Sequence, residues 1–415
     1  MPSKDLAPED DEKTLTVSMS KGEAVNKRKA KNSPHIVTAE SVQAEEVPTI
    51  PLGSLQTLST LEPAVSVRSV EATQSVRLPA PLVVQPSEYR RSPGEWLQVW
   101  WEGIRPDYLP LAIMPVLVGS TLAWTQSVSP RTPFGYFSFL HFIAALLAVV
   151  ALQVGANLVN DYYDYIKGID ISNPLGPGGL IQQGLIRPIG VLNFGLILLA
   201  LGSLIGAVVA ISGGLYVYLF GLIGLLCAYF YSATSRALSS LALGELVSFC
   251  VFGPLLTLGA YLVQTGGFAN RVAFISVLIY SLPLGLLATA VVHVNDMRDV
   301  ESDVQARKRT LASLQGLRWS RTEYLLLVLG AYAIIVALGL PHGAPHLVLI
   351  TLWTLPILVV ALTGVMRADM PATLHLVMRE TLKLLTYFAL LLIAALILTA
   401  IITVLPHLPS HILPI

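Results

Sequence analysis

The chain has 415 residues, of which 54% are hydrophobic and 13% are charged, and its mean hydropathy is +0.66. This composition is typical of a polytopic membrane protein and excludes an ordinary soluble domain. The formal net charge is zero, but residues 1–107 hold 15 of the 26 acidic and 12 of the 26 basic residues. The remaining three quarters of the chain is therefore poor in charge. We expect a lipid bilayer, and no nucleic acid, as its environment.

The N-terminal segment divides into two parts. Residues 1–90 are rich in Ser, Thr, Glu, Lys, Pro and Val without a sustained period, which predicts a disordered cytoplasmic tail. The tail has no apolar stretch with a small-residue cleavage site, so it does not resemble a secretory signal. In residues 91–107 the apolar side chains recur at helical spacing: Trp96, Leu97, Trp100, Trp101 and Ile104. This pattern predicts an amphipathic helix at the membrane interface.

Nine apolar runs follow the amphipathic segment. They cover residues 108–126, 138–158, 189–211, 215–231, 241–263, 272–292, 323–340, 346–366 and 382–404. Most of them reach the roughly 20 residues that cross a bilayer core as a helix. We therefore predict an all-α membrane domain with nine transmembrane helices over residues 108–405, followed by a short C-terminal tail at residues 406–415.

Two acid-rich segments lie at the ends of apolar runs. The first acid segment reads Asn157-Leu-Val-Asn160-Asp161-Tyr-Tyr-Asp164-Tyr-Ile-Lys167-Gly168-Ile-Asp170, and the second reads Asn295-Asp296-Met-Arg298-Asp299-Val-Glu301-Ser-Asp303. They contain seven of the eleven acidic residues found from residue 108 onward. Because ionisable groups at the end of a membrane helix are costly to desolvate, this concentration indicates a functional site.

The basic residues predict the orientation of the chain. Twelve of them follow even-numbered runs: Lys167, Arg187, Arg236, Arg298, Arg307, Lys308, Arg309, Arg318, Arg321, Arg367, Arg379 and Lys383. The opposite side holds only Arg131 and Arg271. By the positive-inside rule, the N-terminus and both acid segments face the cytoplasm of a bacterial-type plasma membrane.

The acid segments have the chemistry of a metal site. Two sets of side chains each share one face of a helix at 100° per residue: Asn157, Asp161 and Asp164, and Asp296, Asp299 and Asp303. Across a bundle these oxygens suit Mg²⁺, which prefers few carboxylates, several waters and phosphate oxygens. The nearby cations suit a phosphate ligand: Lys167, Arg298, Lys308 and Arg309. The residues thus predict a site for a metal-bound diphosphate.

Other interpretations of the same residues stay open. The acid segments are also compatible with ordinary surface ion pairs at cytoplasmic helix ends. A cation-coupled transporter is a second alternative, although it would place acids nearer the middle of the membrane. Glu245, at the start of the fifth run, either favours the first helical turn through the helix dipole or faces a cavity in the bundle.

Several ordered motifs carry a resemblance to a known family. They are Ile104-Arg105-Pro106, the first acid segment, Leu243-Gly244-Glu245-Leu246-Val247, Phe252-Gly253-Pro254, the second acid segment and Lys308-Arg309-Thr310-Leu311-Ala312. Over roughly residues 96–405 the chain resembles the UbiA superfamily of intramembrane aromatic prenyltransferases. Within it, the chain is most similar to the MenA branch, the 1,4-dihydroxy-2-naphthoate prenyltransferases of menaquinone synthesis.

This resemblance implies a nine-helix bundle around a central cavity, with Mg²⁺ and a polyprenyl diphosphate held between the acid segments. The implied metal ligands are Asn157, Asp161, Asp164, Asp296, Asp299 and Asp303, with Asp170 in support, and the implied catalytic residues are Asp161, Asp164, Asp299 and Asp303. The implied substrate-binding residues are Asn157, Lys167, Arg187, Asn295, Arg298, Lys308 and Arg309. In this branch, prenylation of the aromatic acceptor is coupled to loss of its ring carboxylate.

The chain departs from the family pattern at two places. Arg307 stands where many relatives have glycine before Lys308. The loop Gly176-Pro177-Gly178-Gly179 lacks the arginine or lysine that many relatives place there, and Arg187 can take that role. The acceptor is therefore the least specified part of the prediction, and 4-hydroxybenzoate and homogentisate are its alternatives. The prenyl chain length and the oligomeric state are not encoded in these motifs.

Overall fold

The computed structural model describes residues 92–169, 179–234, 236–341 and 345–407, which belong to one compact unit. These residues form helices and contain no β-strand, so the all-α prediction is confirmed for this part of the chain. The predicted disordered tail at residues 1–90 lies outside the described residues. So do Asp170 and the loop at residues 171–178, and all but the first two residues of the predicted C-terminal tail.

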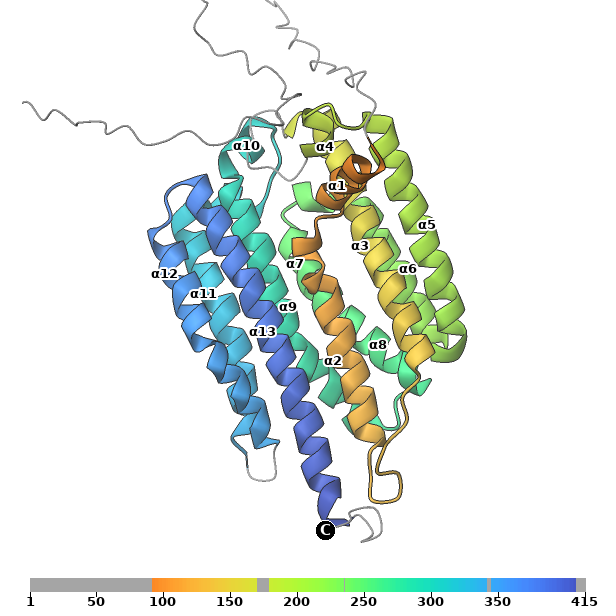
Figure 1. Cartoon of the computed structure of the whole chain (residues 1–415). Helices are drawn as coiled ribbons and strands as arrows, with labels where there is room; N and C mark the ends of the chain where they lie inside the picture. Colours follow the sequence, from red (N-terminus) through yellow and green to blue (C-terminus); the bar gives the residue numbers. More distant parts are fainter. Residues whose placement is uncertain (1–91, 170–178, 235, 342–344, 408–415) are drawn as a thin grey trace, which may run out of the picture. The chain divides into compact units, whose positions relative to one another are not determined.

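The principal helices follow one another along the chain (Figure 1). They are α1 (Pro93–Ile104), α2 (Pro110–Ser127), α3 (Phe139–Lys167), α4 (Gly179–Gln182), α5 (Pro188–Gly213), α6 (Leu215–Phe230), α7 (Gly244–Cys250), α8 (Leu256–Thr265), α9 (Arg271–Arg298), α10 (Val300–Gln305), α11 (Leu311–Gly339), α12 (Leu355–Arg367) and α13 (Pro371–Val404). Short 3₁₀ helices include η2 (Pro106–Tyr108) before α2 and η6 (His346–Thr354) before α12, and the π-helix η5 (Val251–Leu255) joins α7 to α8.

Fewer helices meet the length and composition of a membrane span than the nine predicted. Among the described residues, seven helical segments are long and apolar enough to cross, and an eighth qualifies if the bent pair Pro93–Tyr108 and Pro110–Ser127 forms one span. The remaining candidate, α6, is apolar but has only 16 residues, which is short for a bilayer core of about 30 Å. The count of nine is therefore not confirmed.

The predicted amphipathic helix is present as α1. Ser92 and Glu95 form a capping box, in which the Ser92 hydroxyl accepts from the Glu95 amide and the Glu95 carboxylate accepts from the Ser92 amide. The helix buries Val99 and exposes Trp96 and Trp101. It ends at Arg105, whose left-handed backbone (φ 54°) turns the chain into the bent entry to α2. Its place at the membrane interface stays a prediction.

The two helices that carry the acid segments are longer than their apolar runs. Helix α3 has 29 residues and α9 has 28, so each spans about 42–44 Å at 1.5 Å per residue. Both extend beyond the roughly 30 Å of a bilayer core. The predicted runs stopped at residues 158 and 292 because hydropathy marks only the apolar part of a helix. Residues 157–167 of the first acid segment consequently form the last turns of α3, and the second acid segment runs from the last turn of α9 into the short α10.

The fifth predicted span is not a regular α-helix. It contains the π-helix η5 around Pro254, which has no backbone N–H for the helical ladder. Gly253 of η5 lies directly against Gly285 of α9, and a Cβ atom on Gly253 would lie 2.8 Å from the Gly285 Cα. The absence of a side chain therefore lets this span approach the central helix α9.

We expect Gly253→Val to destabilise the protein by about 1–3 kcal/mol, because the new side chain would collide with the backbone of α9. Thermal unfolding of the purified protein in detergent measures the effect. Gly259→Val is the matched control, since the nearest atom to a Cβ there is the Phe220 Cδ2 at 3.9 Å. Equal unfolding temperatures for the two variants would contradict the importance of this contact.

Helix α9 lies at the centre of the bundle. It packs against α7, α11 and α13, and 61% of its most apolar stretch is buried, the largest share of any candidate span. Helix α3 packs mainly against α5 on another side. Figure 1 shows that the C-terminal end of α3 and the short helix α10 lie at the same end of the bundle. The fold thus brings the two acid segments, which are far apart in the sequence, to one level.

Candidate functional site

A cavity of about 240 Å³ lies between α2, α3, α6, α7 and α9 and reaches the two acid segments. Six of the predicted site residues line it: Asn157, Asp164, Asn295, Asp296, Asp299 and Asp303. A seventh predicted residue, Lys308, lines it as well. Away from these groups the wall is mostly apolar. The cavity therefore has a charged end and a hydrocarbon-like interior.

In the first acid segment, a hydrogen-bonded chain fixes Asp164. The Asn160 amide donates to Asp164 Oδ2 at 2.5 Å, and the Ser232 hydroxyl donates to Asn160 Oδ1 at 2.6 Å. Lys167 donates to the Ser232 carbonyl oxygen at 2.7 Å, instead of lining the cavity. The end of α3 is thereby tied to the turn that follows α6.

Asp161 lies beside the cavity, in contact with Arg105. Its carboxylate is buried and forms an ion pair with the Arg105 guanidinium, which lines the cavity. The left-handed turn between α1 and α2 positions this arginine. The second carboxylate oxygen of Asp161, Oδ2, is buried and has no hydrogen-bond partner in the described part of the chain. In the sequence, Arg105 stands out only as part of the motif Ile104-Arg105-Pro106, which predicts no role for it at the site.

In the second acid segment, Asp299 is held by a two-pronged ion pair. Arg298 donates from Nε to Asp299 Oδ1 at 2.6 Å and from Nη2 to Asp299 Oδ2 at 2.7 Å. The same guanidinium donates to Asn295 Oδ1 at 2.9 Å and to His375 Nδ1 of α13 at 3.2 Å. Arg298 is itself buried and does not line the cavity. The contacts of Arg298 orient Asp299, and Asp299 does line the cavity.

Lys308 lines the cavity and pairs with Asp303 of the second acid segment. Its Nζ lies 3.2 Å from Asp303 Oδ1, and Thr310 donates to Asp303 Oδ2 at 3.3 Å. Burial alone would lower the pKa of Lys308. The carboxylates of Asp303, Asp296 and Asp164 outweigh that effect and raise the pKa above its ordinary value. Lys308 therefore keeps its positive charge beside Asp303.

Two predicted site residues lie away from the cavity. Arg187 is exposed at the start of α5, and the side chain of Arg309 is exposed after α10. Neither lines the cavity. Their proposed contact with substrate stays a prediction.

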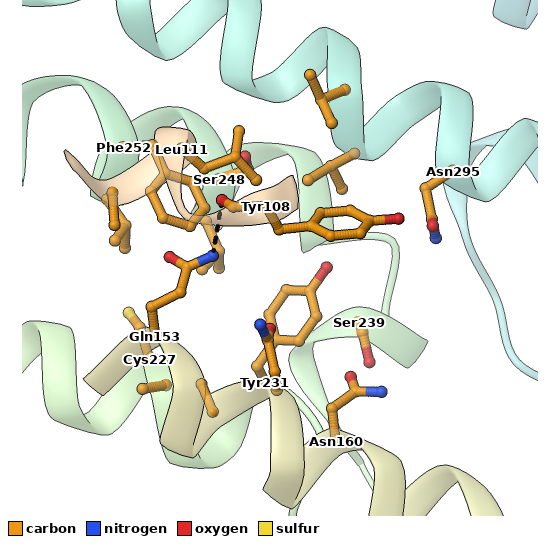
Figure 2. Close-up of a pocket in the computed structure, with 18 of the residues that line it drawn as sticks. Tyr108, Leu111, Gln153, Asn160, Cys227, Tyr231, Ser239, Ser248, Phe252 and Asn295 are labelled. Carbon is orange, nitrogen blue, oxygen red and sulfur yellow. Dashed lines mark hydrogen bonds between the residues drawn. The ribbon is translucent and has the colours of Figure 1, made fainter. Parts of the chain in front are cut away.

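Several cavity residues had no signal in the sequence. Figure 2 shows Tyr108 and Tyr231 reaching into the space between the helices, with Gln153, Ser239 and Ser248 around them. These five residues come from separate elements of the fold. Two of them are in contact, since the Gln153 amide donates to the Tyr108 carbonyl oxygen at 3.4 Å. Serines and tyrosines inside apolar runs are common in ordinary helix packing, so only the tertiary structure distinguishes them.

Glu245 faces the interior of the protein and not the cavity. Its Oε1 lies 3.1 Å from Nδ1 of His293, which is completely buried on α9, and Nε2 of His293 lies 3.0 Å from the Ser320 carbonyl oxygen. Since a carbonyl only accepts, Nε2 carries a proton. The contact between Nδ1 and Glu245 then requires one further proton, shared by the pair. This pair joins α7 to α9 and α11.

Replacing His293 with leucine is expected to lower the stability by about 3–5 kcal/mol, because the Glu245 carboxylate would stay buried without its partner. The double variant His293→Leu/Glu245→Leu should recover most of the loss, since no uncompensated charge remains. Thermal unfolding in detergent measures both. A double variant as unstable as the single one would show that the pair is not what stabilises this contact.

The carboxylate and amide oxygens of the two acid segments suit a hard cation that binds together with a phosphate ligand. Among the described residues, no three His, Cys, Asp or Glu side chains converge closely enough to hold a metal ion by themselves. Mg²⁺ typically takes one or two carboxylates and completes its shell with water and substrate phosphates. The carboxylates of the two segments and the unpartnered, buried Asp161 Oδ2 fit such a shared metal–phosphate site.

Comparison with known proteins gives a consistent result. Residues 112–374, more than half of the chain, match the model of the UbiA prenyltransferase family. The 1,4-dihydroxy-2-naphthoate octaprenyltransferase of Bacillus subtilis is 28% identical over 295 residues, which cover 71% of this chain and 91% of that protein. The UbiA prenyltransferase domain-containing protein 1 homolog of Drosophila melanogaster is 30% identical over 340 residues, covering 81% of this chain and 89% of that protein.

A solved structure supports the fold. The apo structure of a UbiA homolog from Aeropyrum pernix K1 superposes with a TM-score of 0.51 at 19% sequence identity. The superposition covers 71% of this chain and 98% of that one. At this level of identity the likeness concerns the helical architecture alone.

Proposed function

The chain belongs to the UbiA prenyltransferase family, and from this premise we propose that it transfers a polyprenyl group from polyprenyl diphosphate to 1,4-dihydroxy-2-naphthoate. The observation that carries the proposal is the cavity itself, because both acid segments line its charged end while its interior is apolar. A polyprenyl diphosphate has the same division into a charged head and a hydrocarbon chain. The acceptor follows from the MenA-like motifs and from bacterial relatives named for this naphthoate.

We assign the metal site to the oxygens of the two acid segments. Asn157, Asp161, Asp164, Asp296, Asp299 and Asp303 would hold Mg²⁺ together with the diphosphate. When bound, the ion would stabilise the negative charge of the leaving diphosphate. Lys308 and Arg105 offer their cations to the same group, since both line the cavity.

The other predicted diphosphate contacts differ in what supports them. Asn295 lines the cavity. Arg298 and Lys167 are engaged with Asp299 and with the Ser232 carbonyl oxygen, which supports a role in holding the site. Arg187 and Arg309 are exposed, so their role depends on substrate entering from that side.

The proposed reaction takes place between the charged end of the cavity and its apolar interior. The bond between the allylic carbon and the diphosphate oxygen breaks at the charged end. A ring carbon of the acceptor then forms a new bond to the allylic carbon, and the carboxylate on that ring carbon leaves as carbon dioxide. The rings of Tyr108 and Tyr231 line this space and can stabilise the developing positive charge through their faces.

We further propose nine membrane crossings, with α2 and α6 added to the seven long segments, and the acid segments on the cytoplasmic side. The support for this orientation is the unequal distribution of basic residues, twelve against two, between the two sides. An odd number of crossings would place the two termini of the membrane domain on opposite sides of the bilayer.

The decisive experiment incubates purified full-length protein with polyprenyl diphosphate and one acceptor at a time. The panel contains 1,4-dihydroxy-2-naphthoate, 4-hydroxybenzoate and homogentisate, and mass spectrometry identifies the product. We expect the prenylated, decarboxylated 1,4-dihydroxynaphthalene together with carbon dioxide and pyrophosphate, and no product when Mg²⁺ is chelated. Product from another acceptor alone would replace the proposed substrate. Solute flux in proteoliposomes without pyrophosphate release would favour the transporter alternative.

A further inference from the structure

Two uncharged polar side chains that line the cavity, Gln153 and Ser248, lie one helical turn deeper than Asn157 and Asp296 of the acid segments. Gln153 precedes Asn157 on α3 by four residues. Ser248 follows Gly244 on α7 by four residues, and Gly244 lies beside Asp296, since a Cβ atom there would be 3.9 Å from Asp296 Oδ2. Four residues rise about 6 Å along a helix. We call Gln153 and Ser248 the polar layer.

The cavity wall around the polar layer is apolar. Figure 2 shows Gln153 and Ser248 facing the same part of the cavity as Leu111 and Phe252. Val292, four residues before Asp296 on α9, completes the wall at this depth. The polar layer is thus a place for hydrogen bonding inside a section that is otherwise suited to hydrocarbon.

The hydroxyl group of Ser248 lacks a partner. Ser248 is 2% exposed, and its Oγ forms no hydrogen bond with any described residue. Gln153 has a weak contact, since its amide donates to the Tyr108 carbonyl oxygen at 3.4 Å, beyond the usual 2.9–3.0 Å. Leaving a buried hydroxyl unsatisfied costs free energy, which a bound ligand with polar groups would recover.

Neither part of the prenyl donor can be that ligand. The prenyl chain is a hydrocarbon and offers no hydrogen bond. The diphosphate is expected at the charged end of the cavity, about 6 Å away, which is one helical turn from the polar layer. The aromatic acceptor remains. Its reacting carbon must come within about 3–3.5 Å of the allylic carbon, which is attached to the diphosphate, so the ring must lie at about the depth of the polar layer.

We propose that Gln153 and Ser248 bind the aromatic acceptor by hydrogen bonds to its ring hydroxyl groups. This inference rests on the proposed function and adds the residues that recognise the second substrate. Because both side chains are uncharged, they suit a neutral hydroxyl better than an ionised carboxylate. The acceptor carboxylate would then point to the charged end, where Lys308 and Arg105 lie.

The test measures KM for each substrate separately in full-length protein with Mg²⁺ present. We expect Ser248→Ala and Gln153→Met each to raise the KM for 1,4-dihydroxy-2-naphthoate by about two- to tenfold, the value of one neutral hydrogen bond. The KM for polyprenyl diphosphate should not change. With a naphthoate that lacks the hydroxyl bound by Ser248, Ser248→Ala and the unsubstituted protein should have equal KM values.

Thr257→Val is the matched control. Thr257 is also buried with an unpartnered hydroxyl among the described residues, but it does not line the cavity, so both KM values should stay the same. An unchanged acceptor KM in both polar-layer variants, or a raised KM for the donor instead, would refute the inference while leaving the proposed function intact. Failure of the unsubstituted protein to prenylate any acceptor would refute the proposed function itself.

Discussion

Replacing Asp299 with asparagine is expected to slow prenyl transfer by about 10²–10³-fold, in line with the loss of one electrostatic group at a reacting centre. Asp299 lines the cavity, and Arg298 holds both of its carboxylate oxygens at 2.6 and 2.7 Å. Asparagine keeps the shape of the side chain but removes its charge and presents an N–H group to the guanidinium. The initial rate of pyrophosphate release at saturating substrates and Mg²⁺ measures the effect.

The matched control for this prediction is Asp369→Asn. Asp369 also accepts from an arginine, Arg321, at 2.7 Å, but its side chain is 82% exposed and does not line the cavity. An exposed pair of this kind contributes little, so the rate should equal that of the unsubstituted protein. Asp299→Asn protein that retained more than about a tenth of the rate would be incompatible with electrostatic catalysis at this carboxylate.

The second large effect is expected at Lys308. Lys308→Gln removes the cation that lies 3.2 Å from Asp303 Oδ1 and leaves that buried carboxylate without its charged partner. We expect a loss of stability of about 3–5 kcal/mol, as for a buried ion pair that loses one partner. We also expect turnover to fall by about 10²-fold because the diphosphate loses a cation in the cavity.

A double variant tests whether the loss of stability comes from leaving Asp303 without its partner. Lys308→Gln/Asp303→Asn removes the pair whose atoms lie 3.2 Å apart, so thermal unfolding should show most of the stability restored. Turnover should stay low, because the double variant lacks both the cation offered to the diphosphate and the Asp303 carboxylate assigned to the metal site. Recovery of turnover along with stability would show that Lys308 serves the fold alone.

Much of the architecture was predictable because it rests on local patterns. Apolar runs located every long helix, and the spacing of Trp96, Trp101 and their neighbours predicted α1. The ends were predicted less well. Helices α11 and α13 begin at Leu311 and Pro371, ahead of the predicted residues 323 and 382, because hydropathy does not register the polar turns that extend beyond the bilayer core.

The site was predictable only where its residues cluster in the sequence. The acid segments stand out because they hold most of the acidic residues of an apolar region. Arg105 and Tyr231 do not stand out, since an isolated arginine before a span and a tyrosine after one are ordinary features of membrane proteins. Their place at the cavity depends on the left-handed turn after α1 and on the turn after α6.

By itself, the sequence determined that this is an all-α membrane protein with two acid segments at helix ends, because hydropathy and charge act locally along the chain. The tertiary structure decided which of these side chains share one cavity. It placed Asp161 against Arg105 and Arg298 behind Asp299, since helix packing and the competition among buried charges set the direction of each side chain. It also identified the polar layer, because a buried hydroxyl without a hydrogen-bond partner, such as that of Ser248, can be recognised only when every neighbouring helix is in place.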